Sequence, residues 1–142
     1  MPDLVQEVLS DIKTKIIALP EFHKTKVLAY YDGETLLQSI ESMVFPAVGV
    51  VYEGMSSKGT DGYGKAVDMQ FGVYVFPTMQ LKDADVLNAT DILKLCRNVI
   101  IETCAPNNNR YKFSAVIPVD LTDRIAYVQR WTVAGTINPR AV

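Results

Sequence analysis

The stretch Phe45-Pro46-Ala47-Val48-Gly49-Val50-Val51-Tyr52 decides the fold of this chain. It is apolar at consecutive positions, a pattern typical of a strand that is covered on both faces. The apolar run extends over residues 44–52 and predicts a strand inside a sheet or a subunit assembly. Pro46 has no N–H to donate, so it is expected at the beginning of this strand.

Residues 66–76 form the second half of the same predicted unit. Asp68, Gln70 and Tyr74 point one way, and the opposite side is apolar, formed by Val67, Met69, Phe71, Val73 and Val75. Such alternation predicts a long strand with one buried face. The two strands would form a hairpin around a glycine-rich loop, residues 54–65, which holds four of the eight glycines. A compact domain seldom keeps so long a loop without a use for it.

The rest of the chain supplies helices and further strands. Apolar residues at three- and four-residue spacing predict amphipathic helices over 3–19 and 86–104. Residues 35–42 could add one or two helical turns. Further strands are predicted over 26–31, 111–119 and 125–136, and residues 137–142 are predicted to be a loose tail. The order α-β-(α)-β-β-α-β-β indicates an α+β fold: a largely antiparallel or mixed sheet of four to five strands with two main helices packed on it.

The composition limits the classes of function. The chain has 142 residues, 49% hydrophobic and 21% charged, which predicts one globular domain over residues 1–142. The net charge of −2 argues against a dedicated nucleic-acid binder, which needs clustered Lys and Arg. No apolar stretch reaches the length of a membrane span. The first residues do not resemble a secretory signal, so we expect a cytoplasmic location and no membrane partner.

The two cysteines, Cys96 and Cys104, both fall in the helix predicted over 86–104. At about 1.5 Å rise per residue they would lie roughly 12 Å apart. This separation exceeds the reach of a disulfide. We therefore expect two free thiols in the core.

The sequence predicts no catalytic, cofactor or metal site. Gly54 and Gly59-Thr60 have the spacing of a phosphate loop, but the lysine is missing and a strand follows. His23 is the single histidine and lies in no catalytic motif. The carboxylate pairs Asp83/Asp85 and Asp120/Asp123 flank the ends of elements, where aspartate commonly caps helices and forms turns. We expect no enzyme activity and no cofactor.

Aromatic and basic residues lie close together near the C-terminus. This combination can stack and bind single-stranded nucleic acid. On a strand, however, Tyr127 and Trp131 would share one face while Arg124 and Arg130 share the other. We therefore expect the aromatic side chains in the core and the arginines in solvent or at an interface.

Taken together, three features resemble small phage tail terminator proteins, also called tail-completion or neck proteins, of Mu-like and lambda-like tails. The first is the leading helix that ends at Leu19-Pro20. The second is the pair of strands at residues 45–54 and 69–75, split by a polar loop. The third is the helix from Asp91 to Cys104 followed by paired strands.

The resemblance implies a structural virion protein, typically a homohexameric ring. Such a ring caps the tail tube, contacts the tail tube protein and the neck or head connector, and lets DNA pass without specific binding. It would assemble in the host cytoplasm. We expect the glycine-rich loop to be the assembly surface, formed by Met55, Ser56, Ser57, Lys58, Thr60, Asp61, Tyr63 and Lys65. The alternatives are another tube or neck connector, and a ligand-binding or enzymatic α+β domain with residues 54–65 as a lid.

Overall fold

The structure is a computed structural model that describes residues 4–20, 26–30, 36, 47–60, 65–76, 89–121 and 124–137. Within these residues the elements follow one another as α1 (Leu4–Ile17), β1 (Lys26–Tyr30), β2 (Ala47–Thr60), β3 (Lys65–Phe76), α3 (Ala89–Ile100), β4 (Lys112–Leu121) and β5 (Arg124–Ile137). The predicted α+β class is confirmed. The helical turns expected over 35–42 lie outside the described residues except for Leu36. Ile137, predicted to begin a loose tail, is instead the last residue of β5, and residues 138–142 lie outside the described residues.

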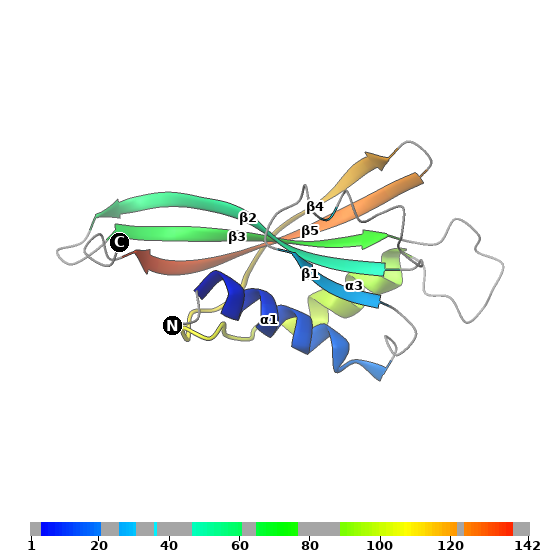
Figure 1. The fold of residues 1–142 in the computed structure, drawn as a ribbon, viewed down its shortest axis with the longest axis horizontal. Coiled ribbons are helices and arrows are strands. Elements are labelled where there is room, and N and C mark those ends of the chain that lie inside the picture. Colours follow the sequence, from blue (N-terminus) through cyan, green and yellow to red (C-terminus); the bar gives the residue numbers. More distant parts are fainter. Residues whose placement is uncertain are drawn as a thin grey trace.

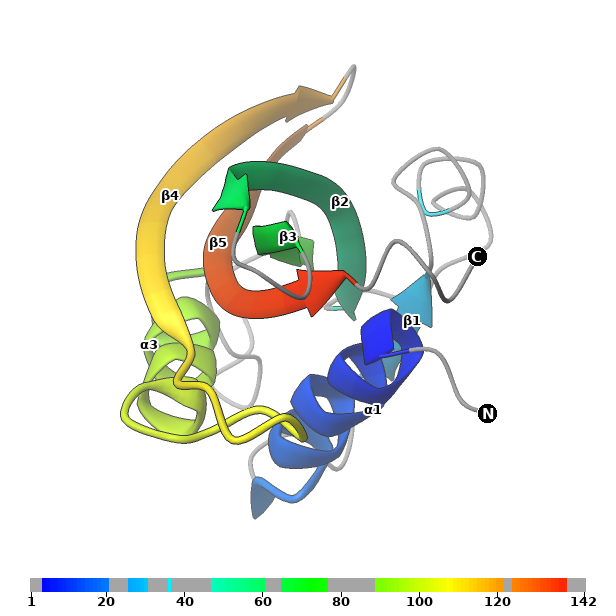
Figure 2. The ribbon, with the colours of Figure 1, turned by 90° about the vertical axis from the view of Figure 1, so that its left-hand side faces the viewer.

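The five strands form one sheet in the order β1-β2-β3-β5-β4. β1 is parallel to β2, and the other three pairs are antiparallel. The predicted hairpin is confirmed, with Val50 of β2 opposite Val73 of β3. The sheet twists strongly along its length, and in end view its strands curl around β3 (Figure 2). The two edge strands, β1 and β4, therefore lie on different sides of the molecule.

Both helices cover the same face of the sheet (Figure 1). The apolar side of α1 faces the sheet. Its buried residues recur at three- and four-residue spacing, as expected for one face of a helix: Val5, Val8, Leu9, Ile12 and Ile16. They join one core cluster with Ile92, Cys96 and Ile100 of α3 and with the sheet residues Val48, Val50, Val67, Met69, Phe71, Val73, Val75, Trp131 and Val133. The alternation read from residues 66–76 is confirmed, because all five of its apolar positions belong to this cluster.

The opposite face of the sheet carries a smaller buried cluster. It consists of Leu36, Ala47, Val51, Phe76 and Ala126. Leu36 lies directly on the backbone of β2, and a Cβ added at Gly49 would stand 2.7 Å from its Cδ1 atom. β2 is therefore buried on both sides at its beginning, as its continuous apolar pattern predicts.

The helix α3 ends at Ile100, four residues before the predicted end. Thr103 donates its hydroxyl to the Ile100 carbonyl at 2.6 Å, and Glu102 adopts a φ of 64°, which breaks the helical backbone. The expectation of two core thiols is thus wrong for Cys104, which is exposed, and right for Cys96, which is buried. Both thiols are free, as predicted. Burial raises the pKa of the Cys96 thiol to about 12.

A buried glutamine joins the sheet to α3. Gln129 of β5 is 1% exposed, the one buried polar side chain among the described residues. Its Nε2 atom donates to the Leu93 carbonyl at 2.9 Å, and its Oε1 atom accepts from Trp131 Nε1 at 2.8 Å. The indole N–H of the fully buried Trp131 is satisfied in this way.

A second polar contact joins α1 to the segment before β4. Tyr111 is buried, and its hydroxyl donates to Asp11 Oδ2 at 2.6 Å. Lys15 pairs with the same carboxylate and lies over the Tyr111 ring, 5.6 Å from its centre. Burial, and then the hydrogen bond and charge of Asp11, raise the pKa of Tyr111. The contact fixes α1 against the chain that leads into the last two strands.

Candidate functional site

Three strands continue past the helices and form what we call the distal arm: residues 55–60 of β2, 65–70 of β3 and 134–137 of β5. Figure 1 shows these strand ends projecting beyond α1 and α3. Their pairing is continuous, with Met55 opposite Met69, Thr60 opposite Lys65, and Lys65 opposite Ile137. The arm is therefore a three-stranded sheet whose base packs with α1 in the main core cluster through Val67 and Met69, and no described helix packs on its far end.

The outer edges of the arm are open in the part of the chain that the structure describes. β1 pairs with β2 only as far as Val51, and β4 pairs with β5 only as far as Thr132. Beyond these points no described strand lies on the outer side of either β2 or β5. The β5 edge is covered at Ala134, because the side-chain amides of Asn107 and Asn109 both donate to its carbonyl, at 2.9 and 2.7 Å, so the β2 edge is the more open of the two. An open edge has unpaired backbone groups that suit another strand.

An irregularity in β2 marks the base of the arm. The register with β3 shifts between Tyr52 and Gly54, so Glu53 is an extra residue in the strand. Gly54 has a φ of 115°, a conformation that glycine adopts without strain. A second shift lies between Ser57 and Gly59. Bulges bend a strand and increase its twist, so two of the loop's glycines serve to shape a strand.

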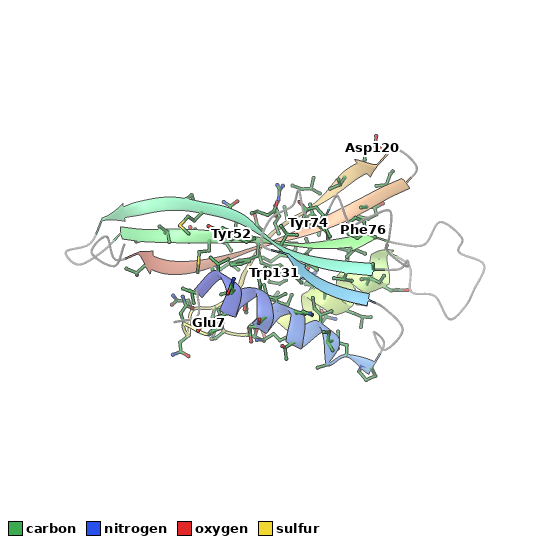
Figure 3. The ribbon with its side chains drawn as sticks, in the orientation of Figure 1. Glu7, Tyr52, Tyr74, Phe76, Asp120 and Trp131 are labelled. Carbon is green, nitrogen blue, oxygen red and sulfur yellow. The ribbon has the colours of Figure 1, made fainter. Side chains whose placement is uncertain are left out.

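The extra residue, Glu53, lies on the sheet face away from the helices. Its Oε1 atom accepts from Arg130 Nε of β5, and its Oε2 atom accepts from the Tyr74 hydroxyl of β3, both at 3.3 Å. Its carboxylate passes over Gly72, where an added Cβ would collide with Glu53 Oε1. Burial first, and then the charge and hydrogen bond of Glu53, raise the pKa of Tyr74. Figure 3 shows Tyr74 on this face and Trp131 on the helix side.

The residues predicted for the assembly surface are only partly those of a loop. Met55 and Ser56 are exposed strand residues, and Met55 is 43% exposed. Ser57, Lys58 and Thr60 belong to β2, and Lys65 begins β3. Asp61 and Tyr63 lie outside the described residues. The predicted loop over 54–65 is therefore wrong for most of its length, because β3 runs alongside and supplies the backbone partners of β2, while β5 pairs with the other edge of β3.

The other candidates from the sequence are dispersed. His23, Asp83, Asp85 and Asp123 lie outside the described residues, and Asp120 is exposed near the end of β4. Gly59 and Thr60 lie in a strand rather than before a helix. Trp131 is buried and Arg130 faces the other way, as the alternation predicts. The described residues contain no group of three His, Cys, Asp or Glu that could hold a metal ion.

A shallow hollow lies on the polar side of α1. It has a volume of about 570 Å³ and is lined by Gln6, Glu7, Ser10, Asp11, Thr14 and Pro106. Figure 3 labels Glu7 on this helix, below the sheet. None of residues 54–60, nor Lys65, lines the hollow; residues 61–64 of the segment considered as a lid lie outside the described residues. Neither described helix is long and apolar enough to cross a membrane.

Sequence patterns missed the residues that shape the base of the arm. Glu53, Gly72 and Arg130 come from three strands, and only the register of the sheet brings them together. The one usable signal is the charged Glu53 directly after a long apolar run, followed by Gly54. Searches against protein-family models and curated proteins found no match to this chain.

Proposed function

We propose that this chain is a structural virion protein, a tail terminator whose copies form a ring that caps the tail tube and connects it to the neck or head. The observation that carries the proposal is the distal arm, whose outer edges pair with no other described strand. A closed ring needs heterologous contacts, in which one surface of a subunit meets a different surface of its neighbour. A projecting three-stranded arm is a surface of this kind, because its edges can pair with a strand of the next copy.

The chemistry of the arm fits an assembly role better than a catalytic one. Met55 offers an exposed, adaptable apolar side chain, and Ser56 beside it offers a hydroxyl. Arg130 and Glu53 at the base pair with each other and hold β2, β3 and β5 at a fixed spacing. The proposed partners are further copies in a homohexamer, the tail tube protein and the neck protein. DNA would pass through the ring, and the net charge of −2 suits passage without adhesion.

Light scattering after size exclusion, followed by negative-stain microscopy, tests the proposal on the full chain. We expect a hexamer-sized species and ring-shaped particles. A protein that stays monomeric at the highest soluble concentration would contradict the ring. Binding to purified tail tube and neck proteins then distinguishes a terminator, which binds the end of a tube, from another neck connector.

A variant with a shortened distal arm, compared with the unmodified chain, tests whether the end of the arm is needed for the ring. Replacing residues 58–66 with Asn-Gly keeps Ser57 opposite Val67 and closes the hairpin with a two-residue turn. We expect this variant to unfold cooperatively but to lose the ring. Rings formed as readily as by the unmodified chain would show that the end of the arm is only a connection.

A further inference from the structure

The outer edge of β4 is a second open edge, on the side of the sheet opposite β1. Its ten residues, Lys112–Leu121, pair with β5 on one side and with no described strand on the other. Large apolar side chains at this edge are unusually exposed for a strand: Phe113 and Val116 are each 41% exposed, and Ile125 of the adjacent β5 is 51% exposed. Exposed apolar side chains beside an unpaired strand edge are typical of a docking surface.

The register assigns several of these residues to one face. Phe113 pairs with Trp131, Val116 with Gln129, Pro118 with Tyr127 and Asp120 with Ile125. Alternate residues of β5 share a face, so their partners on β4 share it as well. Gln129 and Trp131 identify it as the helix side, because both belong to the contacts with α3 and the main core. We call Phe113, Val116, Pro118, Asp120 and Ile125 the β4 strip.

Charge is distributed unevenly along the β4 strip. At its beginning, the exposed Arg97 of α3 lies over the Phe113 ring, 5.4 Å from the ring centre. In the middle, Val116 and Pro118 are apolar. At its end, Asp120 is exposed and lies far from the helices (Figure 3). The strip therefore runs from a cation through an apolar centre to an anion.

We infer that the β4 strip binds the β4 strip of a second copy of this chain, antiparallel and with the two-fold axis at Val116. An antiparallel copy reverses the order of charges, so Arg97 of each copy faces Asp120 of the other. The apolar centres then lie side by side on one face of the joined sheet, and the edges of the two β4 strands supply backbone hydrogen bonds. An isologous contact requires such a self-complementary surface.

Two features keep this contact weaker than a strand pair inside the sheet. Pro118 lacks an N–H, so each copy offers one donor fewer. The register of β4 shifts between Phe113 and Ala115, which disturbs pairing at its beginning. We therefore expect a dimer that forms reversibly and depends on protein concentration. The contact uses β4 and leaves the distal arm free, so it does not rest on the proposed ring.

A charge exchange on the full chain tests the arrangement. Asp120→Lys alone and Arg97→Glu alone should each raise the dimer dissociation constant about tenfold, because each places like charges opposite one another. The double variant, Arg97→Glu with Asp120→Lys, should restore dimerisation. Sedimentation equilibrium measures all four proteins, and cooperative unfolding confirms that each is folded. A double variant as weak as the single variants would overturn the antiparallel arrangement.

Cross-linking locates the two-fold axis independently. Directly opposed residues of an antiparallel pair have Cα atoms about 4.5–5.5 Å apart, within the range of a disulfide. In a Cys104→Ser background, which removes the exposed native thiol, Val116→Cys should form a disulfide-linked dimer under mild oxidation. Ile125→Cys, one strand farther from the edge, should not. A disulfide-linked dimer without rings would support the β4 contact and contradict the proposed ring. Failure of the Val116→Cys protein to cross-link would overturn the β4 contact, whether or not rings form.

Discussion

Glu53 and Arg130 are 77 residues apart in the sequence, and their side chains meet across β3 at 3.3 Å. Glu53 is the extra residue of a bulge in β2, and Arg130 lies on β5. The contact is possible because the intervening strand presents Gly72, which leaves room for the carboxylate. Arg130 is 40% exposed, so the ion pair itself contributes little, about 0.2–1 kcal/mol. The main role of this ion pair is to hold β2, β3 and β5 together where the distal arm begins.

Gly72→Ala should therefore destabilise the protein. The new methyl group would stand 2.9 Å from Val128 Cγ2, a buried and conformationally restricted side chain, as well as displacing Glu53. We expect a loss of about 1–3 kcal/mol in the free energy of unfolding, measured with urea. Gly135→Ala is the control, because the closest contact of its methyl group would be the flexible end of Met69 at 3.1 Å, and Leu4 Cδ2 would lie at an ordinary 3.8 Å. Equal losses in both variants would contradict the role of Gly72.

Gln129→Leu removes both hydrogen bonds of the buried amide. The Trp131 indole N–H would then lack a partner in the core, and we expect a loss of about 1–3 kcal/mol in the free energy of unfolding. Gln70→Leu, at an exposed position of β3, is the matched change and should alter stability by less than about 0.5 kcal/mol. Urea unfolding monitored by tryptophan fluorescence measures both, since Trp131 is the one tryptophan of the chain. A stable Gln129→Leu protein would show that the tryptophan finds another acceptor.

Stability should decline at alkaline pH through Cys96. Its thiol has an ordinary pKa of 9.0 and a folded-state pKa of about 12, raised by burial. Above pH 9 the unfolded chain loses this proton while the folded chain keeps it, so its contribution to stability is present below pH 9 and lost between pH 9 and 12. Cys96→Ala should reduce the slope of unfolding free energy against pH in this window. Cys104→Ala, which changes an exposed thiol, should leave the slope unchanged.

Met55→Asp tests the distal arm with a single substitution. Met55 is 43% exposed, so a carboxylate there remains in water in the isolated subunit and should leave its unfolding midpoint nearly unchanged. In the proposed ring it would be buried without a partner, and we expect at least a tenfold loss of assembly in light scattering. Ile17→Asp, at a 52% exposed position at the end of α1, is the control. Assembly by the Met55→Asp protein equal to that of the control would exclude Met55 from the contact.

Much of the fold follows from local patterns. The helices at α1 and α3, the alternating strand β3 and the hairpin with β2 are each specified by side-chain periodicity within one segment. The ends of the helices and strands were predicted less accurately. Helix α3 stops at Ile100 because Glu102 leaves the helical backbone region, and no strong stop signal stands there in the sequence. The apolar run 99–101 favoured a longer helix.

The glycine-rich segment shows the limit of local reasoning most clearly. Gly54 and Gly59 are typical loop residues, yet both lie in β2 next to shifts in its register. The end of β2 gains its backbone hydrogen bonds from β3, and β3 is held on its other edge by β5, which is distant in sequence. Local composition therefore could not distinguish a loop from the bulged end of a strand.

The sequence alone determined the α+β class, the two-sided burial of β2 and the apolar faces of both helices, because these depend on the spacing of side chains along one segment. Only the tertiary structure decided that Glu53, Tyr74 and Arg130 meet over Gly72, that Gln129 satisfies Trp131, and that no other described strand pairs with the outer edges of β4 and the distal arm. Those features depend on strand order and register. Both arise from packing between segments far apart in the chain, which no local pattern records.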